Sequence, residues 1–260
     1  MEVRILSQFS EINKLFNYKS KNILIVGGTS GIGAHFANFF FKLKANVIVL
    51  GRNKKKLDQI NREKKIFGIC CDITNEIQLD KTINLLKKKI KFIDIIIFTS
   101  GINIRENFIN LNLNNFKKVI NTNLIAAINF YKKIIPFIQN KKKKTNIINF
   151  TSILSTRTLL QRTSYSISKA GLLMLTRNLA LELKDLNVVV NSISPGPLLT
   201  KINKPVLKNK KKYLQMCSKI PMERFGKVNE LETAILFLSS DKSTYITGSE
   251  IVIDGGWQIL

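Results

Sequence analysis

The sequence predicts an α/β protein built on a doubly wound parallel sheet of about seven strands, with helices on both faces. Short β-branched runs alternate with longer amphipathic stretches along the chain, which is the order expected of a parallel sheet. The strand runs are almost continuously apolar, as strands covered on both faces require. The 260 residues, 45% of them hydrophobic and 23% charged, suffice for one large α/β domain that needs no disulfide or metal ion for stability.

The individual elements follow from this periodicity in chain order. Seven runs are expected to form strands: Ile23–Val26, Val47–Leu50, Ile66–Cys71, Ile93–Phe98, Asn146–Thr151, Val188–Ile193 and Glu250–Ile253. Six amphipathic stretches are expected to form helices: Ile32–Leu43, Lys54–Arg62, Glu76–Ile90, Leu113–Phe137, Ser164–Lys184 and Asn229–Leu238. Right-handed crossovers between parallel strands then place a ligand at the carboxyl ends of the strands.

The chain is expected to contain a single domain. Residues 1–21 are interpreted as an N-terminal extension, and residues 22–260 contain no internal repeat and no linker rich in Gly, Ser or Pro. The stretch from Ser194 to Gly226 contains four prolines and is interpreted as irregular. Segments of that length are commonly lids or binding loops, so we expect a substrate lid at about 195–226.

Composition excludes several classes of protein. No apolar run approaches the roughly 18 to 20 residues of a transmembrane helix, and the chain opens with charged residues where a signal peptide would place an apolar region. Cys70, Cys71 and Cys217 are interpreted as core thiols of a cytoplasmic protein rather than as disulfides or ligands. The single histidine, His35, is expected to be structural, so no metal site is predicted and proton transfer must use another side chain.

The formal net charge of +25 raises the question of a nucleic-acid partner. The lysine runs fall after a strand, at helix ends and in a loop, and no aromatic side chains are interleaved with them as stacking platforms. Enrichment in Lys, Asn and Ile together indicates compositional bias. We therefore expect scattered solvated lysines and no nucleic-acid partner, with a functional anion-binding surface as the alternative. The runs are Lys54–Lys56, Lys87–Lys89, Lys141–Lys144 and Lys210–Lys212.

A glycine-rich turn lies between the first expected strand and the first expected helix. In this position, bare backbone lets a pyrophosphate approach a helix amino terminus, whose partial positive charge favours it. The spacing of the glycines is G-x-x-x-G-x-G rather than the common G-x-G-x-x-G. The turn reads Gly27-Gly28-Thr29-Ser30-Gly31-Ile32-Gly33.

A tyrosine and a lysine form the second signal. Tyr165 and Lys169 are four residues apart on one expected helix, so their side chains share a face. A phenol is a poor base at neutral pH, and a nearby ammonium is expected to lower its pKa. Ser152 ends an expected strand, where its hydroxyl can face the same crevice. These three residues are therefore the candidate catalytic set.

Together these motifs resemble the short-chain dehydrogenase/reductase family in its single-domain, Tyr-x-x-x-Lys form, over about residues 22–256. This family has a Rossmann-type fold and transfers a hydride between a nicotinamide cofactor and a carbonyl or secondary alcohol. Further matching segments are Cys71-Asp72-Ile73, Asn121-Thr122-Asn123-Leu124, Asn191-Ser192-Ile193-Ser194-Pro195-Gly196, Arg224-Phe225-Gly226, Tyr245-Ile246-Thr247-Gly248 and Asp254-Gly255-Gly256.

The resemblance implies a role for individual residues. Tyr165 would be the general acid or base, Ser152 would donate a hydrogen bond to the substrate oxygen, and Lys169 would tune Tyr165 and hold the nicotinamide ribose. Asn123 would hold a water in the proton relay. Cofactor contacts would also come from Asp72 and Ile73 at the adenine, from Gly101, and from Pro195, Gly196 and Thr200 at the nicotinamide and pyrophosphate. A homotetramer is implied as well.

Two positions depart from the family pattern. Val26 stands where a threonine is common, which removes one hydroxyl contact. Phe98-Thr99-Ser100-Gly101 replaces the usual Asn-Asn-Ala-Gly, whose amides brace the floor of the cofactor site. Thr99 and Ser100 are expected to supply replacement hydrogen bonds, and Gly101 keeps the close backbone approach.

The segment after the second strand favours NADP(H), with NAD(H) as the alternative. An acidic side chain there would bind the ribose 2′-hydroxyl and repel a 2′-phosphate. This chain instead has Arg52 and Asn53, and an arginine can pair with that phosphate.

The substrate is expected to be a small or carrier-linked carbonyl or alcohol compound. A specific alternative is 3-oxoacyl-acyl-carrier-protein reductase, for which basic Lys141–Lys144 would lie near the entrance. Against it, Leu181 stands where such reductases carry a docking arginine, although Arg177 is one turn away. An alternative of another class is a catalytically silent nucleotide-binding module, but Ser152, Tyr165 and Lys169 are all present.

Overall fold

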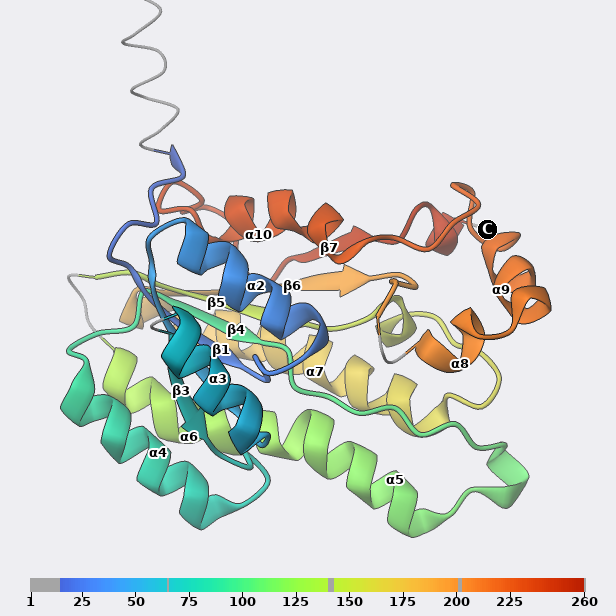
Figure 1. Ribbon diagram of the computed structural model, residues 1–260, viewed down its shortest axis with the longest axis horizontal. Coiled ribbons are helices and arrows are strands. Elements are labelled where there is room, and N and C mark those ends of the chain that lie inside the picture. Colours follow the sequence, from blue (N-terminus) through green and yellow to red (C-terminus); the bar gives the residue numbers. More distant parts are fainter. Residues whose placement is uncertain (1–14, 65, 140–142, 201–202, 260) are drawn as a thin grey trace, which may run out of the picture.

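A single parallel sheet organises the molecule (Figure 1). The computed structural model describes residues 15–64, 66–139, 143–200 and 203–259. The strands run in the order β3-β2-β1-β4-β5-β6-β7, and every adjacent pair is parallel. They are β1 (Asn22–Val26), β2 (Asn46–Gly51), β3 (Phe67–Cys70), β4 (Ile95–Phe98), β5 (Thr145–Phe150), β6 (Val188–Pro195) and β7 (Glu250–Ile253). The predicted doubly wound fold is confirmed.

Helices cover both faces of this sheet because its strands are apolar on both sides. Leu24 and Val26 of β1 belong to the core beneath α4, α6 and α7, whereas Ile23 and Ile25 belong to the core beneath α2, α3 and α10. The helices are α2 (Gly31–Lys42), α3 (Lys54–Lys64), α4 (Glu76–Lys89), α5 (Leu113–Ile120), α6 (Ala126–Ile138), α7 (Thr163–Glu182), α8 (Lys204–Leu207), α9 (Lys210–Cys217) and α10 (Glu232–Ser239).

The strand order reverses between β1 and β4, which lie side by side in the middle of the sheet. The chain leaves β1 toward β2 and leaves β4 toward β5, so the two following loops diverge and leave a crevice at the carboxyl ends. Figure 1 shows α2 above the sheet and α7 below it, each beginning near this edge. Both motifs singled out from the sequence therefore open onto the same crevice.

Several details differ from the expected elements. The expected helix Leu113–Phe137 is α5 and α6 joined by a π-helical turn over Asn121–Ile125. The interpretation of Ser194–Gly226 as irregular is wrong, because β6 extends to Pro195 and the segment contains α8 and α9. Pro205 is compatible with this because it lies in the first turn of α8, where no intrahelical N–H bond is needed.

Three side chains also complete or correct the expectations. Cys70 is exposed because β3 is an edge strand, so only Cys71 and Cys217 are the buried thiols that were expected. His35 on α2 lies 2.7 Å from Glu232 of α10 and links two helices on one face. Lys144 precedes β5 at the amino-terminal edge of the sheet and donates to the carbonyls of residues 240 and 241. It therefore lies away from the entrance, contrary to expectation, while residues 141 and 142 fall outside the described residues.

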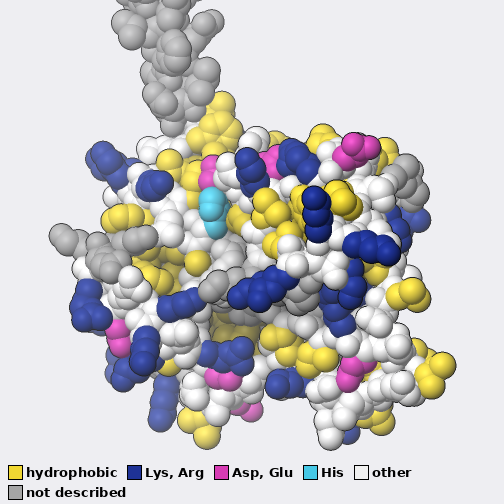
Figure 2. Space-filling model, turned by 45° about the vertical axis from the view of Figure 1, so that its right-hand side comes forward, with side chains coloured by type: hydrophobic (Ala, Val, Ile, Leu, Met, Phe, Trp, Pro, Cys, Tyr) yellow, Lys and Arg dark blue, Asp and Glu magenta, His cyan; other side chains and the backbone are white. Residues whose placement is uncertain are grey.

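Basic side chains are distributed over the surface shown in Figure 2. Lys and Arg occur across the whole of this view, with fewer acidic side chains between them, and do not gather in one stripe. The centre of the same view is hollowed, where the carboxyl-terminal edge of the sheet faces outward. The site described below occupies this edge.

Candidate active site

The glycine turn leaves room for a ligand because it is tightly folded and its glycines have no side chains. Gly27 (φ +91°) and Gly31 (φ +55°) adopt conformations that favour glycine. A Cβ on Gly33 would lie 2.5 Å from both the Gly27 carbonyl oxygen and the Thr99 hydroxyl, so no larger residue fits. A Cβ on Gly31 would instead meet open space. The positive end of α2 is thereby exposed to the crevice, as binding of a pyrophosphate requires.

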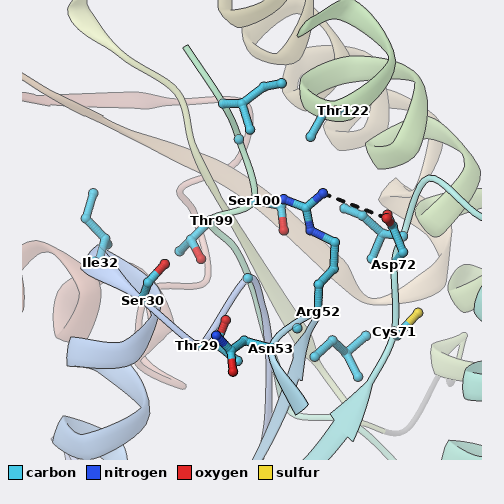
Figure 3. A pocket seen from close by; sticks show the side chains of 18 of the residues that line it. Thr29, Ser30, Ile32, Arg52, Asn53, Cys71, Asp72, Thr99, Ser100 and Thr122 are labelled. Atoms are coloured by element: carbon cyan, nitrogen blue, oxygen red, sulfur yellow. Dashed lines mark ion pairs between the residues drawn. The ribbon is translucent and has the colours of Figure 1, made fainter. Parts of the chain in front are cut away.

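A cleft of about 360 Å³ opens in front of this turn (Figure 3). It runs from the start of α2 to the ends of β2 and β3, and on to the residues after β4. Most of the residues predicted to bind the cofactor line it: Gly27, Thr29, Ser30, Gly31, Ile32, Gly33, Arg52, Asn53, Asp72, Ile73, Gly101 and Thr200. Its shape and its bare backbone fit an extended dinucleotide.

Arg52 reaches across the cleft toward Asp72, as Figure 3 shows. Arg52 Nη1 and Asp72 Oδ2 are 3.8 Å apart, and the arginine side chain is 63% exposed. Burial raises the pKa of Asp72, but hydrogen bonds from Thr74 and the charge of Arg52 outweigh this effect and lower it overall. A long, exposed ion pair of this kind contributes little stability, so Arg52 can exchange Asp72 for another anion.

At the floor of the cleft, Thr99 stands where the family pattern has the second of two asparagines. Its hydroxyl donates to the Val26 carbonyl oxygen (2.9 Å), and its backbone N–H donates to the same oxygen (2.9 Å). These bonds join the ends of β4 and β1 directly beneath the glycine turn. The predicted replacement hydrogen bond of Thr99 is thus present.

A second cavity, of about 130 Å³, adjoins the cleft and is lined by Ser152 and Tyr165. Ile32 and Thr200 line both spaces, so the cavity and the cleft lie side by side. Pro195 and Gly196 line the cavity rather than the cleft. The remaining lining residues are Asn103, Thr151, Ile153, Leu154, Leu159, Arg162, Pro197, Leu198, Asn203 and Met216.

The environment of Tyr165 differs from the sequence expectation. Burial raises the pKa of the Tyr165 phenol, while its hydrogen bond with Ser152 and the charge of Arg162 lower it. Lys169 Nζ lies 5.8 Å from the tyrosine ring centroid and donates to the Phe150 carbonyl oxygen (2.7 Å). Burial lowers the pKa of Lys169 to about 8. Arg162, which sequence analysis missed, is a cation whose charge lowers the pKa of Tyr165.

Asn123 is fully buried in the π-helical turn and fixes the loop after β4. Its Oδ1 accepts from the Ile102 N–H (2.8 Å), and its Nδ2 donates to the Ile102 carbonyl (2.9 Å) and to the Ser168 hydroxyl (2.9 Å). A Cβ on Gly101 would lie 3.4 Å from Asn123 Oδ1 and 3.5 Å from Lys169 Nζ. All four residues predicted to be catalytic are thus brought to one edge of the sheet.

Comparison with known proteins identifies the family. A family model described as enoyl-(acyl carrier protein) reductase matches residues 26–258. The 3-oxoacyl-[acyl-carrier-protein] reductase FabG of Thermotoga maritima is 30% identical over 243 residues, which cover 92% of this chain and 98% of that protein. The chain belongs to the short-chain dehydrogenase/reductase family.

Other relatives and solved structures agree with this assignment. The FabG reductase of Buchnera aphidicola subsp. Baizongia pistaciae is 34% identical over 242 residues, covering 91% of this chain and 96% of that protein. A short-chain type dehydrogenase/reductase from Mycobacterium marinum is 28% identical, with a TM-score of 0.88 and coverage of 96% and 100% of the two chains. A gluconate 5-dehydrogenase from Burkholderia cenocepacia, solved with NADP and tartrate, shares the fold at 22% identity, with a TM-score of 0.90 and coverage of 96% and 99%.

Family membership fixes the class of reaction. The protein is an NAD(P)-dependent oxidoreductase that transfers a hydride between nicotinamide and a carbonyl or secondary alcohol of a small or carrier-linked substrate, and not a silent binding module. Among the described residues no cluster of His, Cys, Asp and Glu suits a metal ion. No helix in that part of the chain is both long and apolar enough to span a bilayer.

Lys169→Met should flatten the pH dependence of the free energy of unfolding. The pKa of Lys169 is about 8 in the folded protein and near 10.5 in the unfolded chain, so the unfolded state binds the extra proton between these values. The stability of the wild type should therefore gain up to about 3 kcal/mol from this residue as the pH rises from about 8 to about 10.5, a gain that Lys169→Met lacks.

Chemical denaturation across that pH range measures the difference. Lys184→Met, which removes an exposed lysine just beyond the end of α7, is the control and should follow the wild type. If the free energy of unfolding rises equally with pH in wild type and Lys169→Met, burial does not lower the pKa of Lys169.

Proposed function

We propose that the protein is an NADP(H)-dependent carbonyl reductase and alcohol dehydrogenase in which Ser152, Tyr165 and Lys169 form the catalytic set. The single observation that carries this proposal is the adjacency of the two spaces. The cleft that fits a dinucleotide shares Ile32 and Thr200 with the cavity that Ser152 and Tyr165 line. A substrate oxygen bound to the hydroxyls of Ser152 and Tyr165 therefore lies next to the cleft.

The proton steps follow from this arrangement. When bound, the nicotinamide supplies or accepts a hydride at C4. In reduction, Tyr165 donates its proton to the substrate oxygen, and Ser152 donates a hydrogen bond to the same oxygen as negative charge develops there. The buried ammonium of Lys169 stabilises the tyrosinate that results, in a water-poor setting where charge interactions are strong. In oxidation the same groups act in reverse.

The cofactor contacts are proposed from the lining of the cleft. The glycine turn (residues 27–33) would hold the pyrophosphate through its backbone, with Thr29 and Ser30 supplying hydroxyls. Asp72 and Ile73 would hold the adenine, and Gly101 would allow close approach of the ribose. Pro195, Gly196 and Thr200 would lie at the nicotinamide, and Lys169 would bind its ribose. Asn123 would act as a positioning residue, because its side chain binds the Ile102 backbone and Ser168 rather than facing the cavity.

Tyr165→Phe should abolish turnover and leave cofactor binding nearly unchanged. The ring still fills its place, but the transferable proton is lost, and removal of a general acid typically costs about 10²–10⁴-fold in rate. Steady-state reduction of a panel of ketones and NADPH binding by fluorescence measure the two effects. Tyr213→Phe, at a ring packed against Phe225 outside the cavity, is the control. Turnover by Tyr165→Phe above a few per cent of wild type would refute the proposed proton donor.

The preference for NADP(H) is proposed from the end of β2. Arg52 lines the cleft, and Lys56 lies beside it and donates to the Thr29 carbonyl oxygen (3.2 Å). A 2′-phosphate would meet positive charge there and could replace Asp72 as the partner of Arg52.

Arg52→Gln should weaken NADPH binding by about tenfold or more and change NADH binding by less than about threefold, because the 2′-phosphate loses a charge-assisted hydrogen bond. Dissociation constants for both cofactors at one salt concentration test this. Arg62→Gln, which removes an exposed arginine of the adjacent α3, is the matched control. Equal or tighter binding of NADH by the wild type would sink the claim.

A second candidate is reduction of 3-oxoacyl groups on an acyl carrier protein. The relatives that are 30 to 34% identical over nearly the whole chain carry that name, which favours it. Two observations weigh against it: Leu181 is an exposed leucine where a docking arginine was sought, and Lys144 lies at the opposite edge of the sheet from the cavity. We therefore rank it below the general activity.

Other features of the family remain proposals for this chain. Exposed apolar side chains on two neighbouring helices, α5 and α7, support a homotetramer. These side chains are Leu113, Ile167, Met174 and Leu181. The segment at about 195–226 is proposed as the substrate lid because Pro197, Leu198, Asn203 and Met216 line the cavity. We also propose that residues 22–260 act as one domain, and that the protein is cytoplasmic.

A further inference from the structure

Arg162 places a positive charge inside the cavity where the proposed chemistry occurs. Among the described residues that line this cavity it is the only charged one, and it is 8% exposed. Arg162 precedes the first residue of α7 and stands three positions before Tyr165, so the two side chains leave neighbouring parts of the helix start. The guanidinium and the Tyr165 phenol thus face one small space.

The described part of the chain gives Arg162 no counter-ion. The ion pairs found there all involve other residues, and no carboxylate is among the described residues of the cavity. The Glu106 carboxylate, on the loop before α5, accepts a hydrogen bond from Asn115 Nδ2 (2.7 Å). A buried guanidinium without a partner is costly, and residues of this kind are usually paired.

Arg105 adds a second positive charge on the same side. It is half-buried on the loop that follows β4. Burial and, to a smaller extent, the charge of Arg105 lower the pKa of Arg162 to about 10, although Tyr165 acts in the opposite direction. Burial likewise lowers the pKa of Arg105. Arg105 does not line the cavity, but an anion bound at Arg162 would also reduce the repulsion between the two guanidinium groups.

We propose that the substrate carries a carboxylate, which Arg162 binds with support from Arg105, and that the enzyme interconverts short oxo acids and hydroxy acids. This inference rests on the proposed function, because Arg162 acts on substrate only if Ser152 and Tyr165 hold the reacting oxygen. A planar guanidinium suits a carboxylate, which it can bind through two parallel hydrogen bonds. The cavity volume of about 130 Å³ accommodates an acid of a few carbon atoms.

The reaction balances without a further reactant. The carbonyl carbon gains the hydride that NADPH loses, and the carbonyl oxygen gains the proton of Tyr165, which solvent later restores. The carboxylate is unchanged and remains bound to Arg162. A neutral thioester offers no negative charge at this position and would leave Arg162 unpaired, so the same residue disfavours carrier-linked substrates.

Matched pairs of substrates test the proposal on the full-length enzyme with NADPH. The pairs are pyruvate and methyl pyruvate, acetoacetate and methyl acetoacetate, and levulinate and methyl levulinate, with the N-acetylcysteamine thioester of acetoacetate as a neutral carrier mimic. At least one acid should exceed its ester in kcat/KM by about tenfold or more, mainly through a lower KM, because it forms charge-assisted hydrogen bonds that the ester lacks.

Variants of Arg162 and Arg105 show which arginine causes the preference for the acid over its ester. Arg162→Gln should bring the ratio of acid to ester close to one, Arg162→Lys should retain part of the preference, and Arg105→Gln should lower it by a smaller factor. Arg157→Gln is the matched control, since Arg157 is exposed on the same connection and bonds the Gln258 carbonyl oxygen. NADPH binding by each variant shows that the fold is intact.

Three outcomes would overturn the proposal. The first is a wild type that prefers the esters or the thioester, and the second is an acid preference that survives in Arg162→Gln. The third is a wild type that reduces none of the acids and binds none of them to its NADPH complex. Failure of the proposed function is distinguishable, because Tyr165→Phe would then keep its turnover whichever member of a pair is used.

Discussion

The site depends on one constraint, namely that the carboxyl ends of parallel strands meet at a common edge. β1 leads into the glycine turn, β4 into Thr99, β5 into Ser152 and β6 into the turn at Pro195, and all four strands are adjacent in the sheet. Residues far apart in sequence therefore converge without special long-range contacts. The hydrogen bond from Thr99 to the Val26 carbonyl ties the ends of β4 and β1 together where the strand order reverses.

Buried positive charge distinguishes this edge from the rest of the molecule. Most of the basic residues are solvated at the surface, whereas Lys169 and Arg162 are 4% and 8% exposed. Lys169 is satisfied by the Phe150 carbonyl, but Arg162 has no acidic partner in the described chain. Burying these cations costs stability, and bound anions would offset that cost. The proposals made above give the two cations different roles, Lys169 toward the tyrosine and Arg162 toward the substrate.

Much of this account is readable from the sequence because it rests on local patterns. Apolar β-branched runs predict the strands, and the glycines and Tyr165 with Lys169 predict the two sides of the crevice. The direction in which a side chain points is harder to predict, because it depends on neighbours that are distant in the sequence. Lys169 bonds the Phe150 carbonyl at the end of β5, and Cys70 is exposed because β3 is the edge strand. The spacing of three residues between Arg162 and Tyr165 could have indicated that the two side chains are close. The burial of Arg162, however, is apparent only once the fold is known.

The central claim is that the cleft and the cavity form one reaction site, in which the cofactor transfers a hydride directly to a substrate bound at Ser152 and Tyr165. Reduction of a ketone with NADPH carrying deuterium at C4 of the nicotinamide tests this most directly. The account predicts that one of the two C4 positions delivers its deuterium to the carbinol carbon of the product, with no loss to solvent. Product without deuterium from either C4 position, formed while NADPH is consumed, would contradict direct transfer and with it the proposal of a single reaction site.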